Sequence, residues 1–286
     1  MFLLILLILA VPVIILYIDS NTRLVTTEYK LSYKNLPASF EGYRIVVLAD
    51  VHGAQLGEDN GQLVDAVRAV KPDMIAIVGD LIDRYQPGKP VEEQLEIAQT
   101  LIEKLITVAP VYFVTGNHEW DSGELRPLLE MLSENGVNVL RNQYELLTTG
   151  AATGENTGDG AIILIGVDDP NGPADMIKPD ELVENIRQKE KTDFIVVLSH
   201  RNYNLKMYDR LGVDLVLSGH AHGGMVRLPF TDGLVGPQGD FFPTYTSGVY
   251  TSGQTNMVVS RGVGNHLGWT RFLNNPQVLV VELRSG

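Results

Sequence analysis

The sequence predicts an α/β fold in which helices pack outside β-sheets, and three observations carry this prediction. Short runs rich in Val and Ile alternate along the chain with longer amphipathic segments, which is the pattern of strands alternating with helices. The apolar runs are bounded by Gly, Asp or Asn, as buried strands usually are. The 286 residues are 44% hydrophobic and 20% charged, which supplies apolar material for a sizeable core and excludes disordered and fibrous proteins.

The N-terminal segment has the composition of a membrane anchor. Residues 1–18 are apolar apart from Pro12, and as a helix they are just long enough to cross a hydrocarbon core about 30 Å thick. A cleaved signal peptide is the alternative, but it would need basic residues before the apolar run and a small-x-small site after it. We therefore expect one transmembrane helix and a single-pass protein of the cell membrane. Arg23, Lys30 and Lys34 follow the span, which slightly favours the cytoplasmic side for the rest of the chain.

The rest of the chain divides at about residue 43. Residues 19–42 predict a polar connecting segment with one edge strand, and residues 43–286 predict the folded domain. Buried strands are predicted at residues 44–49, 74–78, 111–115, 161–167, 194–199 and 214–218. Helices are predicted at residues 62–70, 91–108, 124–134, 180–189 and 203–211. Residues 150–160, rich in Gly and Thr, predict a surface loop, and residues 226–228, 257–260 and 278–283 predict strands that complete a second sheet.

Charge and cysteine content exclude several functions. Lys and Arg total 22 against 35 Asp and Glu, a formal net charge of -13, so the chain lacks the basic surface that non-specific nucleic-acid binding requires. The absence of cysteine excludes disulfide scaffolds, thiolate metal sites and cysteine nucleophiles. The composition makes no prediction of the oligomeric state.

Polar motifs follow five of the predicted strands, at the point where each strand ends. In chain order they are Asp50-Val51-His52, Gly79-Asp80-Leu81-Ile82-Asp83-Arg84, Gly116-Asn117-His118-Glu119, Ser199-His200 and Gly219-His220-Ala221-His222. On extended backbone, residues i and i+2 point the same way, so we expect Asp50 and His52 to emerge together, and His220 and His222 likewise. Because ligands of layered α/β proteins bind at the carboxyl ends of strands, the motifs should converge on one rim.

Each motif alone has an ordinary structural explanation, but the set does not. A lone Asp after a strand is usually a turn or a helix cap, and His118 alone is more often a half-buried structural histidine. Three carboxylates, four imidazoles and one amide without sulfur suit manganese, iron, zinc or magnesium, and they are too many ligands for one ion. Two metals can activate water and polarise a phosphoryl group, so the residues predict a two-metal hydrolase. His266 has no partner motif and is expected to be an ordinary loop residue.

Taken in order, these motifs resemble the calcineurin-like metallophosphoesterase superfamily over roughly residues 43 to 222. The resemblance implies a four-layer α-β-β-α sandwich of two mixed sheets flanked by helices. It implies that seven residues bind two divalent metals, manganese, iron or zinc: Asp50, His52 and His222 the first, Asn117, His200 and His220 the second, with Asp80 bridging. It also implies that His118 acts near the leaving-group oxygen, that Asp83 orients His118, and that Arg84 contacts the phosphate. No other cofactor is expected.

The later segments resemble a membrane-associated, phosphodiesterase-like bacterial branch of the same superfamily. They are residues 223–229, 241–243 and 260–265. The resemblance leaves the substrate open. An anchor and an apolar loop together suggest a phosphodiesterase or pyrophosphohydrolase that acts on a lipid-linked phosphoester at the membrane, and nucleotide-like diesters are the competing substrates. Aromatic residues within 229–252 either form a hydrophobic substrate channel or dip into the membrane surface, or they pack as a loop over the site. A membrane-tethered metal-binding sensor or scaffold without turnover is the alternative from a different functional class.

Overall fold

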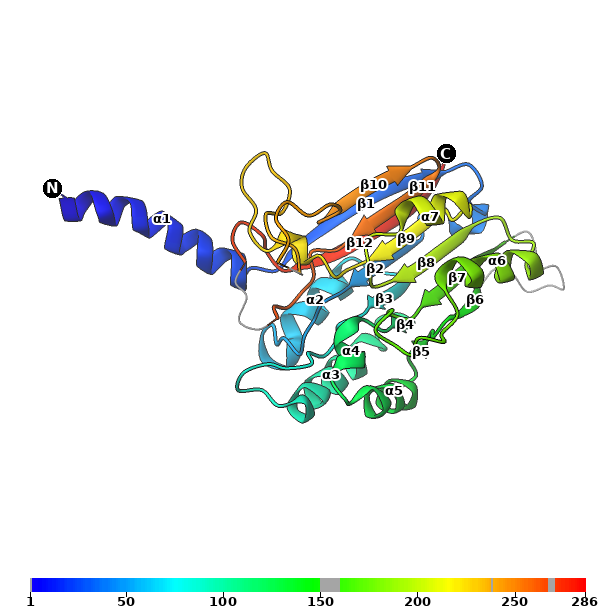
Figure 1. Cartoon of the computed structure of the whole chain (residues 1–286), viewed down its shortest axis with the longest axis horizontal. Coiled ribbons are helices and arrows are strands. Elements are labelled where there is room, and N and C mark those ends of the chain that lie inside the picture. Colours follow the sequence, from blue (N-terminus) through cyan, green and yellow to red (C-terminus); the bar gives the residue numbers. More distant parts are fainter. Residues whose placement is uncertain (1, 150–159, 238, 267–270) are drawn as a thin grey trace.

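The computed structural model describes residues 2–149, 160–237, 239–266 and 271–286 (Figure 1). Its helices are α1 (Phe2–Thr22), α2 (Gly61–Ala69), α3 (Val91–Leu105), α4 (Asn117–Asp121), α5 (Leu125–Glu134), α6 (Pro179–Lys189) and α7 (Leu205–Arg210). Its strands are β1 (Val25–Tyr33), β2 (Arg44–Leu48), β3 (Met74–Val78), β4 (Val111–Val114), β5 (Asn138–Val139), β6 (Gln143–Thr148), β7 (Ala161–Val167), β8 (Ile195–Ser199), β9 (Leu215–Ser218), β10 (Gly248–Ser252), β11 (Thr255–Val259) and β12 (Gln277–Ser285).

The strands form two six-stranded mixed sheets. The first has the order β1-β12-β2-β3-β4-β5, and in it only β12 and β2 pair antiparallel. The second has the order β10-β11-β9-β8-β7-β6, with parallel pairs in the middle and antiparallel pairs at both edges. The strands β2, β3, β4, β7, β8 and β9 are apolar except for Arg44 at the start of β2 and a serine at the end of β8 and of β9, because helices cover one face of each sheet and the other sheet covers its second face.

The two sheets pack face to face and helices cover their outer faces. Ile45 and Val47 of the first sheet share one buried core with Leu164 and Val196 of the second. The outer face of the first sheet packs against α2, α3 and α5, and the outer face of the second packs against α6 and α7. The predicted arrangement of two mixed sheets flanked by helices is therefore confirmed. It brings the carboxyl ends of β2, β3, β4, β8 and β9 to one end of the sandwich.

The six predicted internal strands and five predicted helices are all present within a few residues of their expected limits. Two expectations about the C-terminal part are wrong. Residues 226–228 form only isolated bridges, from Val226 to Phe272 and from Arg227 to Gly233, because the chain turns too soon to pair as a strand. The strand β12 joins the first sheet and not the second, since it inserts between β1 and β2. The predicted loop at residues 150–160 lies outside the described residues except for Gly160.

The chain before residue 43 forms helix α1 and the first strand of the first sheet. Residues 25–33 form the edge strand β1, which pairs in parallel with β12 along its whole length. Helix α1 projects away from the body of the molecule, with its C-terminal end against it (Figure 1). Within the part of the chain that the structure describes, no helix meets the length and hydropathy needed to cross a membrane.

Candidate metal centre

The predicted site residues meet at one end of the sandwich, in tight turns directly after the strands. Asp50 and His52 follow β2, Asp80 follows β3, and His220 and His222 follow β9. All five have positive φ values, between 46° and 68°, a left-handed conformation that costs non-glycine residues about 1–3 kcal/mol each. The expectation that extended backbone orients the two i, i+2 pairs is therefore wrong, although the pairs do converge. Such strain persists only where the surroundings impose it, and it clusters at functional sites.

Asp50, His52 and His222 form a first buried group. Their side-chain donor atoms lie within 4.8 Å of one another, and Nε2 of His52 faces Nε2 of His222 at 3.2 Å. The backbone N–H of His220 donates to both oxygens of Asp50, each at 3.1 Å, which fixes the carboxylate. Burial, with the charge of Asp80 adding to it, raises the pKa of Asp50 to about 7. A cation between these atoms would relieve both the facing imidazole nitrogens and the buried carboxylate.

Asp80, His200 and His220 form a second buried group of the same kind. Nδ1 of His200 donates to the backbone oxygen of Val78 at 2.8 Å, so in the neutral ring the lone pair is on Nε2. That Nε2 lies 3.1 Å from Oδ2 of Asp80. Two lone pairs at this distance repel each other unless a proton or a metal ion lies between them. A protonated His200 ring or a metal ion at this point would remove the repulsion.

Burial keeps three of the four histidines in these two groups neutral. It lowers the pKa of His52 to about 3 and the pKa of His220 to about 2, and it holds the pKa of His222 well below its usual value. Burial also opposes charge on His200, but the nearby carboxylates, that of Asp80 foremost, outweigh it and raise its pKa to about 10. Neutral imidazoles and ionised carboxylates are the forms that bind metals.

The residues present fit divalent metal ions. Asn117, the first residue of α4, presents a buried Oδ1 with no hydrogen-bond partner among the described residues, and Nε2 of His200 is in the same position. Buried acceptors without a partner are rare in folded proteins because they forfeit their hydration. Nitrogen and oxygen donors without sulfur suit manganese, iron and zinc. Oδ2 of Asp80 lies 3.8 Å from Nε2 of His52 as well as close to His200, so it faces both groups.

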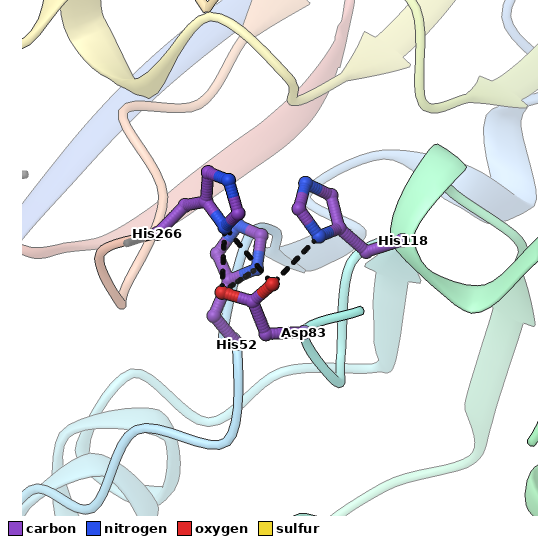
Figure 2. Close-up of side chains that lie close together, drawn as sticks. All are labelled: His52, Asp83, His118 and His266. Carbon is purple, nitrogen blue, oxygen red and sulfur yellow. Dashed lines mark hydrogen bonds and ion pairs between the residues drawn. The ribbon is translucent and has the colours of Figure 1, made fainter. Parts of the chain in front are cut away.

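Asp83 holds two histidines beside these two groups (Figure 2). Nδ1 of His118 lies 2.8 Å from Oδ1 of Asp83, and Nδ1 of His266 lies 2.7 Å from Oδ2. Because a carboxylate only accepts, both rings donate from Nδ1, and their second nitrogens turn away from Asp83 (Figure 2). Burial opposes ionisation of Asp83, but these hydrogen bonds hold the pKa of its carboxyl well below the usual range. Burial likewise opposes charge on His118, but Asp83 outweighs it and the pKa of His118 is raised.

Two residues of this site were missed by sequence reasoning. His266, expected to be an ordinary loop residue, lies against Asp83 and lines the same cavity as His118. No sequence signal marks it, because its partner is 183 residues away. Glu119 was noted only as part of its motif. Its buried carboxylate accepts backbone N–H bonds from Gly116, Asp80, Leu81 and Ile82 at 2.6–3.2 Å, and so ties the turn after β3 to the start of α4.

Two guanidinium groups border the cavity over these residues. Arg84 is half exposed and pairs with Asp121 at 3.2 Å. Arg201 is buried, forms a two-point ion pair with Asp169, and donates to Nε2 of His220 at 2.8 Å. The cavity has a volume of about 270 Å³. Its lining includes Asp80, Arg84, Asn117, His118, Asp121, Asn171, Arg201, His220, His222, Met225, Pro237 and His266.

Comparisons with known proteins agree with this arrangement. The model of the calcineurin-like phosphoesterase family matches residues 43–224. The chain is 29% identical over 263 residues to the uncharacterized metallophosphoesterase YkuE of Bacillus subtilis, covering 91% of this chain and 85% of that protein. It is 28% identical over 211 residues to a transmembrane protein with metallophosphoesterase domain from Danio rerio, covering 70% of this chain and 44% of that one.

Among solved structures, a dimetal phosphatase from Danio rerio is similar with a TM-score of 0.46 and 13% identity, over 78% of this chain and 88% of that one. The family model spans well over half of the chain and contains every strand-end motif described above. The protein belongs to the calcineurin-like phosphoesterase family, whose members are metal-dependent hydrolases of phosphoesters.

Proposed function

We propose that the protein is a two-metal phosphodiesterase or pyrophosphohydrolase that acts on a lipid-linked or nucleotide-like substrate at a membrane. The observation that carries the proposal is the pair of buried donor groups, Asp50 with His52 and His222, and Asp80 with His200 and His220, that meet at one cavity. When bound, two divalent ions supply activation of water and neutralisation of phosphoryl charge. The protein's own residues hold those ions and handle the proton and the substrate.

Asp50, His52 and His222 would hold one metal, and Asp80, His200 and His220, with Asn117, would hold the other. Asp80 would be the ligand common to both metals, since its Oδ2 lies 3.8 Å from Nε2 of His52 in the first group and 3.1 Å from Nε2 of His200 in the second. Manganese, iron and zinc suit these donors. Glu119 keeps Asp80 in place through the backbone N–H of that residue, with a hydrogen bond of 2.9 Å.

His118 donates the proton that the leaving oxygen requires. Asp83 accepts from Nδ1 of His118, which leaves Nε2 facing the cavity and favours the protonated ring. His266 donates to the same carboxylate and so completes a network of two histidines around one acid. Arg84 lies at the rim of the cavity, where its guanidinium can reach a phosphoryl oxygen of the substrate.

The loop over the cavity favours a substrate with an apolar part. Met225 and Pro237 line the cavity, and the same loop carries three exposed phenylalanine side chains. Phe230 is fully exposed, and Phe241 and Phe242 are 77% and 72% exposed. Exposed aromatic side chains in one loop mark a surface that contacts another molecule. We assign this loop to an apolar substrate or to the membrane surface, with a packed covering loop as the alternative.

The N-terminal helix supports an action at a membrane. Seven large apolar residues of α1 are 38–59% exposed: Val11, Val13, Ile14, Ile15, Leu16, Tyr17 and Ile18. No described helix meets the length and hydropathy of a membrane span, but exposed apolar side chains on a helix that projects from the body favour contact with lipid. We propose residues 1–18 as the membrane anchor of a single-pass protein, residues 19–42 as the connecting segment and residues 43–286 as the catalytic domain, with a slight preference for the cytoplasmic face.

Hydrolysis of chromogenic monoester and diester substrates by the full-length protein in detergent tests the proposal. The protein is stripped of metal and reloaded with manganese, iron or zinc. We expect metal-dependent release that is lost in Asp80→Asn and kept in Asp65→Asn, a matched change of an Asp on α2 whose side chain is 78% exposed. The preferred ester then decides between diester and lipid-linked substrates for the next assay. Two bound ions per chain without release from any substrate would instead favour the metal-binding sensor or scaffold.

A further inference from the structure

The last turn of α1 is hydrogen-bonded to residues 271–275, which precede β12. Nδ2 of Asn275 donates to the backbone oxygen of Asp19 at 2.7 Å, and the N–H of Leu273 donates to Oγ of Ser20 at 2.7 Å. Ser20 is 1% exposed, so this contact excludes water. The helix therefore ends in a polar interface with the body of the protein.

Asn21 makes the central contact of this interface. Its Nδ2 donates to the backbone oxygen of Arg271 at 2.8 Å, and its Oδ1 accepts from the N–H of Arg271 at 3.0 Å. One side chain thus satisfies both backbone groups of Arg271, as a neighbouring strand would. The next residue, Thr22, differs: its hydroxyl is exposed and donates only within the helix, to the oxygen of Ile18.

Arg271 carries the contact towards the metal centre. Its side chain is fully buried, and none of the ion pairs among the described residues involves it. The guanidinium instead donates from Nε to Oδ1 of Asn265 at 2.7 Å and from Nη2 to the oxygen of Gly264 at 2.7 Å. A buried guanidinium is costly unless its donors are used, so these two bonds fix Gly264 and Asn265 firmly.

Gly264 and Asn265 lie next to residues of the proposed active site, both in sequence and in space. The N–H of Gly264 donates to the oxygen of Asp50 at 2.7 Å, and a side chain at Gly264 would collide with the backbone oxygen of Val51. His266 follows, and its Nδ1 donates to Asp83. One continuous set of contacts therefore joins α1 to a metal-binding aspartate and to the acid that holds His118.

We propose that the last turn of α1, through Asn21 and Arg271, is a positioning element of the catalytic centre that holds His266 against Asp83. This inference rests on the proposed function for its effect on turnover, but the hydrogen bond of His266 exists independently of turnover. Asn21 does not touch the cavity, so it acts through His266 and is not a catalytic residue. The N-terminal helix is then part of the enzyme's working structure and more than a tether.

The test is a double-mutant cycle of Asn21→Ala and His266→Ala in the full-length protein, with Thr22→Ala as the matched control. We expect Asn21→Ala and His266→Ala each to lower kcat by about ten-fold, since small displacements of catalytic groups cost up to about a hundred-fold, with little change in KM. We expect the double variant to match the single variants, because both changes remove one interaction. Thr22→Ala should keep the wild-type kcat. Multiplying effects in the double variant, or wild-type turnover in Asn21→Ala, would overturn the proposal.

A second measurement separates this proposal from the proposed function. The Nδ1–H of His266 is followed by NMR in protein labelled with ¹⁵N-histidine, and its signal is assigned with His266→Ala. We expect Asn21→Ala to shift this signal or to abolish it through exchange with water, and Thr22→Ala to leave it unchanged. If the wild type has no hydrolase activity but the signal responds in this way, the proposed function fails and the positioning contact stands. An unchanged signal in Asn21→Ala contradicts the positioning role even if the enzyme is active.

Discussion

Replacing Glu119 by Gln should destabilise the protein far more than its position outside the ligand set indicates. The side chain is fully buried, and its two oxygens accept four backbone N–H bonds. A glutamine oxygen can replace only one carboxylate oxygen, so two N–H groups would face an NH₂ group that donates. Each hydrogen bond to a charged group contributes about 1.5–3 kcal/mol, so the two lost bonds set an upper limit of about 3–6 kcal/mol on the fall in the free energy of unfolding. Burial of the charge, which raises the pKa of Glu119, offsets part of this loss at high pH. Most single substitutions have a much smaller effect.

Urea denaturation of the metal-free protein, followed by circular dichroism, measures this loss. Burial, with the charge of Asp80 adding to it, raises the pKa of Glu119 to about 7, so the measurement is made at pH 8, where the carboxylate is mostly ionised. The matched control is Glu134→Gln at an exposed position of α5, which should stay within about 0.5 kcal/mol of the wild type. A loss below about 1 kcal/mol for Glu119→Gln would refute the reasoning, because it would mean that the four N–H groups do not depend on a carboxylate.

Three further predictions concern the metals and the proton donor. His118→Ala should lower kcat by about 10²- to 10⁴-fold. Asp80→Asn should lower kcat further and should also weaken manganese binding in a calorimetric titration. Similar losses of kcat in the two variants would contradict the bridging role of Asp80. Asp83→Asn removes a charge that raises the pKa of His118, so less of that ring stays protonated at high pH. The basic limb of the kcat profile should therefore move to lower pH, which a pH–rate series checks. Removal of metal by a chelator should lower the melting temperature measured by differential scanning fluorimetry. Metal at a hundred-fold excess over its Kd stabilises the folded state by about 2.7 kcal/mol, so an unchanged melting temperature would contradict bound metal.

The sequence allowed the sheets to be predicted closely because parallel strands buried on both faces are continuous apolar runs. Strand β3, for example, has the predicted limits. The strand ends were located for the same reason, and with them the residues that the structure brings together. The five-residue helix α4 was missed because it is too short to show helical spacing. The sheet to which β12 belongs was predicted wrongly because an apolar run in the sequence does not indicate which sheet the strand joins.

The part of the site that could not be predicted is the part that depends on contacts between distant segments. His266 reaches Asp83 from a loop in which Arg271 is hydrogen-bonded to Gly264, and neither contact has a local signature in the sequence. The conformation of Asp50 and His52 was also missed. A left-handed conformation is unfavourable for both residue types, so the surrounding structure and not local preference imposes it.

The position of β12 has a consequence for how the chain folds during synthesis. It lies between β1 and β2 in the first sheet. These two strands are synthesised early, but the strand that pairs with both is the last of the described strands to be synthesised. Until Gln277–Ser285 has left the ribosome, β1 and the antiparallel edge of β2 have no partner, and unpaired edges of this kind favour aggregation. A nascent chain stopped before Gln277 should therefore contain the metal-binding motifs and yet depend on chaperones to stay in solution.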